Sequence, residues 1–340
     1  MSRLRHVDCG GPGLTRRRFG RGFGYLDEHG NPIRDEEVVE RITALAIPPA
    51  WRDVWICPYA NGHLQAVGTD DAGRRQYLYH PRWREHRDRE KFETMLAFGR
   101  GLPAVRGRVA KHLRRQGLSR ERVLACAVGL LDQGLFRVGG EEYADENGSY
   151  GLATLERRHV TLDHGAIVFD YEGKTGRRQV HRVSDPALYR VARELTRSRR
   201  RDPRFLAYRN GSGLVDVRSD EINAYVKELA GDEFSAKDFR TWHATVLAAV
   251  TLALAGEPPG ATARKRALKD AICTVSDSLG NTPAVCRASY VDPRVIDRFA
   301  AGRTIADTLG RLAWRPDRPL SVARRNELEA SVLELLDESV

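Results

Sequence analysis

The sequence predicts an α+β protein, in which a small sheet-rich N-terminal domain precedes a mainly α-helical second domain with one small antiparallel sheet. Three observations predict this class. Short strand-like segments separated by turn residues dominate the first 90 residues. Helical periodicity then takes over. A single group of strand-like segments interrupts it between residues 159 and 182.

Length and composition favour a folded protein. The 340 residues are 41% hydrophobic and 30% charged, which suffices for two domains with cores. No run approaches the roughly 20 apolar residues of a membrane span, and the first twenty residues carry Arg and Gly where a secretory signal would be apolar. We therefore expect a cytoplasmic, nucleoid-associated protein without a membrane partner.

The N-terminal part divides into an arm and a domain. Residues 1–20 are rich in Gly and Arg and predict a flexible basic arm. The domain over residues 21–90 is expected to hold one helix, with Asp35 as its cap and Val38, Val39, Ile42 and Leu45 at helical spacing. Its strands are expected at residues 23–25, 53–57, 63–67 and 75–80.

Residues 91–340 form the predicted mainly α-helical second domain. A first helix straddles its boundary, and the predicted helices span residues 83–99, 103–116, 120–133, 186–198, 221–230, 235–254, 261–274, 282–289 and 322–338. The small antiparallel meander is expected at residues 159–162, 166–171 and 178–182.

The net charge and the cysteine spacing indicate which kinds of ligand and cross-link to expect. Lys and Arg number 56 against 46 Asp and Glu, and the resulting charge of +10 favours a polyanion, although many basic proteins bind no nucleic acid. The five cysteines are scattered and never spaced as C-x2-C. They predict neither a disulfide framework nor a zinc site, and we expect most to fill the core.

Four segments set polar residues inside structural patterns: residues 135–139, 171–176, 237–243 and 280–290. Phosphoryl transfer without a metal requires fixed positive or hydrogen-bonding groups around the non-bridging oxygens. Arginine suits this task because its planar fork stays charged and can bind two oxygens at once.

Each segment also has a simpler interpretation. Arg137 precedes two glycines at a predicted helix end, where it could merely complement the helix dipole. Lys174 lies in a Glu-Gly-Lys-Thr-Gly turn, where an exposed lysine is common. This turn lacks the spacing of a phosphate-binding P-loop.

Lys237 and Arg240 share one face of a helix that begins near Ser235, with Asp238 as its capping-box partner. Two like charges on one face favour an anion site. Tyr290 follows a short helix that contains proline. A phenol with an ordinary pKa of about 10 attacks readily only beside cations.

Together and in this order, the four segments resemble the catalytic domain of the poxvirus-like and bacterial type IB DNA topoisomerases. Residues 46–57, 62–66 and 73–80 resemble the N-terminal domain of the same family. The resemblance therefore extends from about residue 20 to about residue 300.

The resemblance implies roles for individual residues. Tyr290 matches the nucleophile, Arg137 and Arg240 the two phosphate-clamping arginines, and Lys174 the general acid. The implied DNA contacts are Lys237 near the scissile phosphate, Tyr143 on the backbone, and Gln76, Tyr77 and Tyr79 on a strand that enters the major groove. Strand alternation predicts that Tyr77 and Tyr79 share a face with Arg75.

One position departs from the family pattern. The family commonly has His nine residues before the nucleophile, and Asn281 stands there in this chain. Its amide could donate a hydrogen bond to a phosphate oxygen but carries no charge. Alternatively, Asn281 could cap the helix that begins with Thr-Pro.

The family resemblance implies a monomer that clamps duplex DNA between two domains. It would relax supercoils through a 3′-phosphotyrosine intermediate, strand rotation and religation, with no ATP, metal or other cofactor. A tyrosine recombinase is the nearest alternative, but it typically shows H-x-x-R where this chain has Lys237 and Arg240, and it acts as a tetramer. A non-catalytic basic DNA-binding protein is the other alternative.

Overall fold

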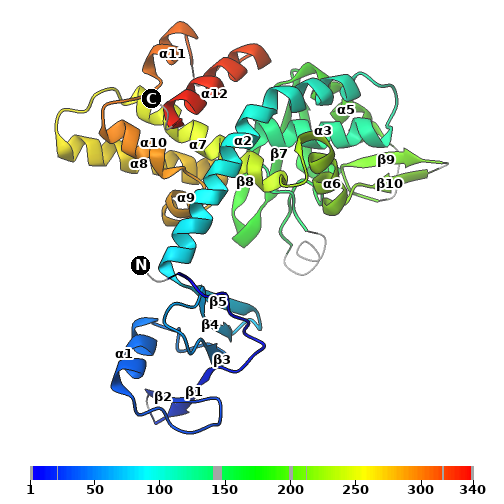
Figure 1. Cartoon of the computed structure of the whole chain (residues 1–340). Coiled ribbons are helices and arrows are strands. Elements are labelled where there is room, and N and C mark those ends of the chain that lie inside the picture. Colours follow the sequence, from blue (N-terminus) through cyan, green and yellow to red (C-terminus); the bar gives the residue numbers. More distant parts are fainter. Residues whose placement is uncertain are drawn as a thin grey trace. The chain divides into compact units, whose positions relative to one another are not determined.

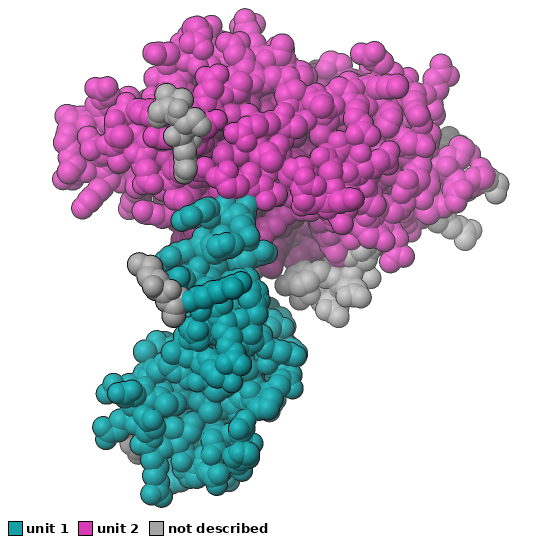
Figure 2. All heavy atoms as spheres, viewed as in Figure 1, with its two compact units in different colours: residues 1–91 teal, residues 92–340 magenta. Residues whose placement is uncertain are grey.

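The computed structural model describes residues 3–20, 22–140, 148–198, 202–211, 213–315 and 318–337. The chain divides into two compact units, Met1–Lys91 and Phe92–Val340, which Figure 2 colours separately. The change in composition along the sequence predicts this division between residues 90 and 91. The predicted α+β class is confirmed, because a five-stranded antiparallel sheet is followed by a mostly helical unit with two smaller sheets.

Unit 1 has an antiparallel sheet with a short helix packed against it (Figure 1). The strand order is β2-β1-β3-β4-β5, and the strands are β1 (Leu14–Phe19), β2 (Gly22–Leu26), β3 (Arg52–Ile56), β4 (Leu64–Thr69) and β5 (Arg75–Tyr79). Helix α1 (Glu36–Ala44) begins after Asp35, whose carboxylate accepts hydrogen bonds from the Glu37 and Val38 amides. The predicted cap is therefore confirmed, and Ile42 of this helix packs in a small core with Val54, Ile56 and Ala66.

The expectation of a flexible arm over residues 1–20 was wrong for Leu14–Phe19, which forms β1. This strand pairs with β2 along its length and with β3 at its start. Arg16 donates hydrogen bonds to the carbonyls of Ile47, Pro48 and Trp51 at 3.0, 2.9 and 2.6 Å. An arginine-rich segment thus becomes ordered because the backbone pairs on both edges and one guanidinium binds three carbonyls.

Unit 2 is mainly helical. Its helices are α2 (Pro81–Leu113, which begins in unit 1), α3 (Arg120–Gly134), α5 (Pro186–Arg197), α6 (Ser219–Ala230), α7 (Ala236–Leu254), α8 (Ala261–Leu279), α9 (Pro283–Ser289), α10 (Pro293–Ala300), α11 (Ala306–Arg311) and α12 (Val322–Leu336). Helix α7 is buried over much of its surface and packs against α3, α6, α8, α10, α11 and α12. It therefore provides a rigid support for any side chain on its exposed first turn.

The predicted meander is confirmed as a three-stranded antiparallel sheet of β6 (Val160–Asp163), β7 (Ala166–Glu172) and β8 (Arg178–Val183). A 3-10 turn, η2 (Lys174–Gly176), connects β7 to β8. A separate hairpin of β9 (Ala207–Asn210) and β10 (Gly213–Asp216) was not predicted. Its four-residue strands are too short for a clear alternating pattern.

The helices predicted over residues 83–99 and 103–116 are one helix, α2, with Pro103 inside it. A proline in a helix removes one backbone hydrogen bond and usually ends the helix. Here Phe98, Leu102 and Val105 are buried on both sides of the proline, so packing of a continuous apolar face offsets the lost bond. In the described residues, no helix is both long enough and apolar enough for a membrane span.

Candidate active site

One pocket gathers five of the predicted site residues. Its volume is about 390 Å³, and Arg137, Lys174, Lys237, Arg240 and Tyr290 all contribute to its lining. They come from four separate places in the chain: the segment after α3, the β7–β8 turn, the first turns of α7, and the end of α9. Folding therefore brings the four sequence segments together.

The position of Arg137 depends on how the chain leaves α3. That helix ends at Gly134, and the capping residue Leu135 has a left-handed backbone (φ 55°). Arg137 then accepts a backbone hydrogen bond from Leu152 at 2.8 Å. Gly139 and Gly151 lie so close that a Cβ on Gly151 would come within 2.5 Å of Gly139 Cα. Two glycines thus permit the close backbone approach that fixes the segment after Arg137.

Arg240 is the most buried of the site cations, with 5% of its surface exposed. It lies on α7, just after the predicted capping box, in which the Ser235 amide donates to Asp238 at 2.8 Å. Its guanidinium donates to the backbone carbonyls of Leu135 and Leu279. Arg240 therefore joins the ends of α3 and α8 to α7.

The electrostatics of the site favour an anion. Burial, and then the charge of Arg137, lower the pKa of Arg240 to about 10. Its Nε atom is buried and has no hydrogen-bond partner among the described residues. Two neighbouring guanidiniums with spare donor capacity are suited to the oxygens of a phosphate.

Tyr290 lies at the C-terminal end of α9. The centre of its ring is 5.6 Å from the guanidinium carbon of Arg240. Its backbone is held by the Thr245 hydroxyl, which donates to the Tyr290 carbonyl and accepts from the Asp292 amide, both at 3.2 Å. The ring is therefore held at the cationic pocket with its backbone anchored to α7.

The two lysines lie on exposed parts of the pocket rim. Lys174 is the first residue of η2, so the hairpin turn carries it to the pocket. Lys237 is exposed on the first turn of α7, one turn before Arg240. A helix N-terminus adds its own attraction for anions at that end.

The N-cap interpretation of Asn281 is wrong, because Thr282 caps α9 with its hydroxyl, which accepts from the Val285 amide at 3.3 Å. The side-chain oxygen of Asn281 instead accepts a hydrogen bond from Arg137. Its amide nitrogen is buried without a partner in the described part of the chain. Asn281 thus positions Arg137 through its side-chain oxygen, and its side-chain N–H groups can donate to a phosphate oxygen.

Three residues behind the arginines were not predicted as part of the site: Tyr171 and Cys286 are buried, and His181 is half-buried. Burial raises the pKa of the Tyr171 phenol and of the Cys286 thiol, and it lowers the pKa of His181 to about 4 with help from Arg240. All three side chains are therefore neutral at pH 7. Tyr171 and His181 lie on adjacent strands, so strand alternation could have identified their buried face.

The strand β5 presents aromatic rings on its exposed face. Tyr77 and Tyr79 are 42% and 38% exposed, and their ring centres are 6.2 Å apart. Arg75 shares their face, as the alternation predicted, with its guanidinium 5.9 Å from the Tyr77 ring. Gln76 faces the other side and donates to Asp70 at 2.9 Å. Tyr143 lies outside the described residues.

Comparison with known proteins identifies the family. Residues 80–302 match the model of the eukaryotic DNA topoisomerase I catalytic core, and residues 22–70 match that of the bacterial DNA topoisomerase IB N-terminal domain. The chain is 28% identical over 287 residues to DNA topoisomerase 1B of Acanthamoeba polyphaga mimivirus, covering 82% of this chain and 85% of the viral protein.

Two further relatives match shorter stretches. DNA topoisomerase 1B of Vaccinia virus (strain Copenhagen) is 25% identical over 149 residues, which cover 42% of this chain and 48% of the viral protein. DNA topoisomerase 1 of Mycosarcoma maydis is 28% identical over 177 residues, which cover 47% of this chain and 17% of the fungal protein. The family models and the mimivirus relative together cover both units, and the chain belongs to the type IB family of DNA topoisomerases.

Proposed function

We propose that this chain relaxes supercoiled duplex DNA by cleaving one strand through a covalent 3′-phosphotyrosine bond to Tyr290. The observation that carries the proposal is the single pocket lined by Arg137, Lys174, Arg240 and Tyr290. These are the side chains that a phosphodiester transfer without a metal needs: a nucleophile, a proton donor and two cations for the non-bridging oxygens.

The chemistry follows from these groups. The Tyr290 phenol gives its proton to solvent water and its oxygen forms a bond to phosphorus, while the bond from phosphorus to the 5′ oxygen breaks. Lys174 gives a proton to that leaving oxygen, which departs as a 5′-hydroxyl. Arg137 and Arg240 hold the two non-bridging oxygens throughout, because charge concentrates there in the transition state.

Religation reverses the same step. The phosphotyrosine is a phosphodiester like the bond that it replaces, so its formation conserves the bond energy and ATP has no role. After the cleaved strand rotates, the 5′-hydroxyl gives its proton back to Lys174 and its oxygen bonds to phosphorus. The bond from phosphorus to the Tyr290 oxygen breaks, and that oxygen takes a proton from solvent water. The cations of the pocket supply the charge that a metal ion supplies in other phosphoryl transfers.

For DNA binding, we propose that the chain acts as a monomer whose two units close around duplex DNA. The charge of +10 supports a polyanionic partner. In unit 1, the exposed rings of Tyr77 and Tyr79 beside Arg75 support a contact with the major groove. In unit 2, the exposed Lys237 supports a contact beside the scissile phosphate.

The decisive test is relaxation of negatively supercoiled plasmid by the purified protein in EDTA and without ATP. The proposal predicts a ladder of relaxed topoisomers, and an absence of relaxation at every salt concentration would refute it. A tyrosine recombinase would instead yield recombinant products from paired sites.

The nucleophile is tested separately. We expect Tyr290→Phe to form no covalent adduct after SDS treatment yet to bind duplex DNA about as well as the parent, because phosphate contacts dominate affinity. The measurements are adduct formation on labelled DNA and a binding titration. An adduct that persists in this variant would assign the nucleophile to another residue.

A further inference from the structure

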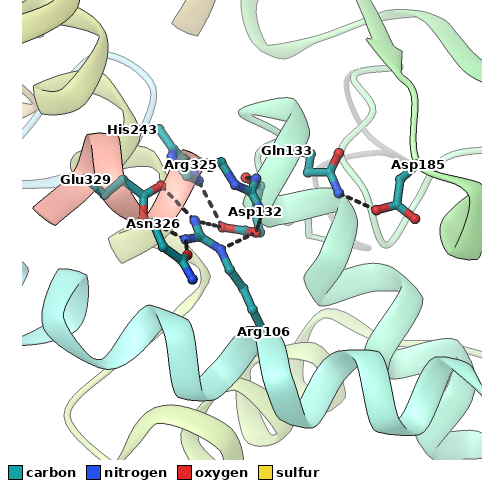
Figure 3. A network of polar contacts seen from close by, with 8 residues as sticks. All are labelled: Arg106, Asp132, Gln133, Asp185, His243, Arg325, Asn326 and Glu329. Atoms are coloured by element: carbon teal, nitrogen blue, oxygen red, sulfur yellow. Dashed lines mark hydrogen bonds and ion pairs between the residues drawn. The ribbon is translucent and has the colours of Figure 1, made fainter. Parts of the chain in front are cut away.

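A buried polar cluster lies in unit 2, centred on Arg106 of α2 and Asp132 of α3. Figure 3 shows Arg106 pointing at Asp132 on one side and at Glu329 and Asn326 of α12 on the other. Its guanidinium donates to both Asp132 oxygens at 2.8 and 2.9 Å and to both Glu329 oxygens at 2.7 Å. The side chains of all three ionic residues are 7% exposed or less.

Arg325 of α12 gives the cluster a direct contact with the end of α3. One of its Nη atoms donates to the Asp132 carboxylate at 2.5 Å, and the other donates to the Asp132 backbone carbonyl at 3.0 Å. Asp132 lies in the last turn of α3, where backbone carbonyls lack partners within the helix. Arg325 therefore caps the C-terminal turn of α3 from a distant part of the chain.

Asp132 is linked to both clamp arginines, because its own helix α3 ends shortly before Arg137 and the neighbouring helix α7 carries Arg240. Three residues beyond Asp132, Leu135 accepts a hydrogen bond from Arg240, and Arg137 follows two residues later. On α7, His243 lies one turn after Arg240, and its Nε2 is 3.6 Å from Asp132 Oδ1. The cluster thus contacts α3 and α7 within one helical turn of the site.

Charge balance makes the cluster sensitive to single changes. Arg106 and Arg325 are matched by Asp132 and Glu329. Burial alone would raise the pKa of Asp132. Contacts with His243, Arg325 and Arg106 outweigh burial and hold this pKa below its usual range. A neutral residue at position 329 would leave the buried guanidinium of Arg106 and the half-buried guanidinium of Arg325 sharing one carboxylate, and such an unbalanced charge forces neighbouring groups to move.

From these contacts we infer that α12 is a positioning element for the active site, in which Arg325 and Glu329 act through Asp132 to hold the end of α3 and, with it, Arg240. The match to the family's catalytic core ends at residue 302, so α12 lies beyond the matched stretch. The inference rests on the proposed function, because it concerns the rate of the same cleavage step.

The test is the variant Glu329→Gln, with Glu334→Gln as its matched control. Glu334 is exposed on the same helix, so the control makes the same chemical change outside the cluster. The rate of adduct formation on end-labelled duplex DNA, trapped with SDS in a single turnover, should fall about 10- to 100-fold in Glu329→Gln, since small displacements of positioning groups have effects of this size. Glu334→Gln should keep the parent rate, and DNA affinity should change little in both.

A double variant separates positioning from general destabilisation. In an Arg240→Ala background, Glu329→Gln should slow the reaction by less than about twofold more, because the group that it positions is gone. In a Lys237→Gln background it should keep its full effect. All rates are compared at a temperature at which every variant is folded. If Glu329→Gln does not fold, Arg325→Gln replaces it with the same expected results.

Three results would overturn the inference: a parent rate in the folded cluster variant, a fall in melting temperature without slower cleavage, or an equal loss in the Arg240→Ala background. A parent protein that forms no adduct would instead refute the proposed function itself. A parent that forms adduct beside an unimpaired cluster variant would refute this inference alone.

Discussion

Arg240 is both buried and positively charged, and burial without a bound anion disfavours the charge. Its guanidinium is 5% exposed, and burial and then Arg137 lower its pKa to about 10. Because the folded-state pKa is below the ordinary value, the protonated form lowers stability at neutral pH, and this cost fades as pH rises through about 10. A bound phosphate supplies a negative charge beside Arg240. DNA binding should therefore remove this electrostatic cost to stability.

Asn281 adds a neutral contact to this cationic pair. We expect Asn281→Ala to slow cleavage by about 10- to 1000-fold, the range for loss of one transition-state donor. Asn281→Asp should slow cleavage as well, since a carboxylate beside Arg137 competes with the phosphate, but it should keep or raise the melting temperature. Single-turnover cleavage and thermal unfolding measure the two effects.

Thr282→Ala is the control for Asn281. It removes the observed cap of α9, so it should cost about 1 kcal/mol of stability and leave the cleavage rate close to that of the parent. A parent cleavage rate in Asn281→Ala would show that the amide has no part in the chemistry.

At the scale of elements, the local sequence pattern suffices to predict a helix or strand that has its own cap, turn or alternation of apolar residues. The β6–β8 meander has alternating residues and a Gly-containing turn, and α7 has a capping box and an apolar face. Lys174 and Arg240 could be placed on these elements because their positions follow from the same local pattern. The grouping of four segments in one pocket needed the order of motifs in the family.

The features that the sequence does not predict depend on packing between residues far apart in the chain. Pro103 lies inside α2 because buried residues continue on both sides of it, and this burial depends on distant helices. The contact between Arg106 and Glu329 joins residues 223 positions apart, so neither sequence neighbourhood indicates a buried ion cluster. Asn281 was ambiguous because its neighbour Thr282 is an equally good cap.

The close approach of Gly139 and Gly151 offers a test of how the element after α3 is held. A Cβ at Gly151 would meet backbone atoms of Gly139 at 2.5 and 2.6 Å, and backbone cannot move aside as a flexible side chain can. We expect Gly151→Ala to cost about 1–3 kcal/mol of stability and to slow cleavage by displacing Arg137. Urea unfolding and single-turnover cleavage are the measurements.

Gly140→Ala is the matched control, because a Cβ at this position has nothing within 4 Å. It should change stability by less than about 0.5 kcal/mol. Equal effects of the two substitutions would mean that loss of backbone freedom, and not the close contact, governs this segment.

At the scale of the whole molecule, the two units contribute chemically different surfaces. Unit 1 presents the rings of Tyr77 and Tyr79, and unit 2 presents a cationic pocket with Lys237 at its rim. Aromatic contacts release few counterions from DNA, whereas each cation that neutralises a phosphate releases nearly one. If both units bind the same duplex, the binding free energy should contain two contributions. The contribution of the cations in unit 2 should depend on salt concentration, and that of the aromatic rings in unit 1 should not.

This division predicts different salt responses for two variants, both measured in the Tyr290→Phe background so that only binding is observed. Lys237→Gln should lower affinity mainly at low salt and reduce the slope of log K against log salt by about 0.9, the value for one lost phosphate contact. Tyr79→Ala should lower affinity by a similar factor at every salt concentration and leave the slope unchanged. Fluorescence titrations of labelled duplex DNA between 50 and 200 mM salt, as approximate limits, cover the range in which such slopes are clear. A parallel shift in Lys237→Gln would remove this lysine from the phosphate contacts, and an unchanged affinity in Tyr79→Ala would exclude β5 from the DNA interface.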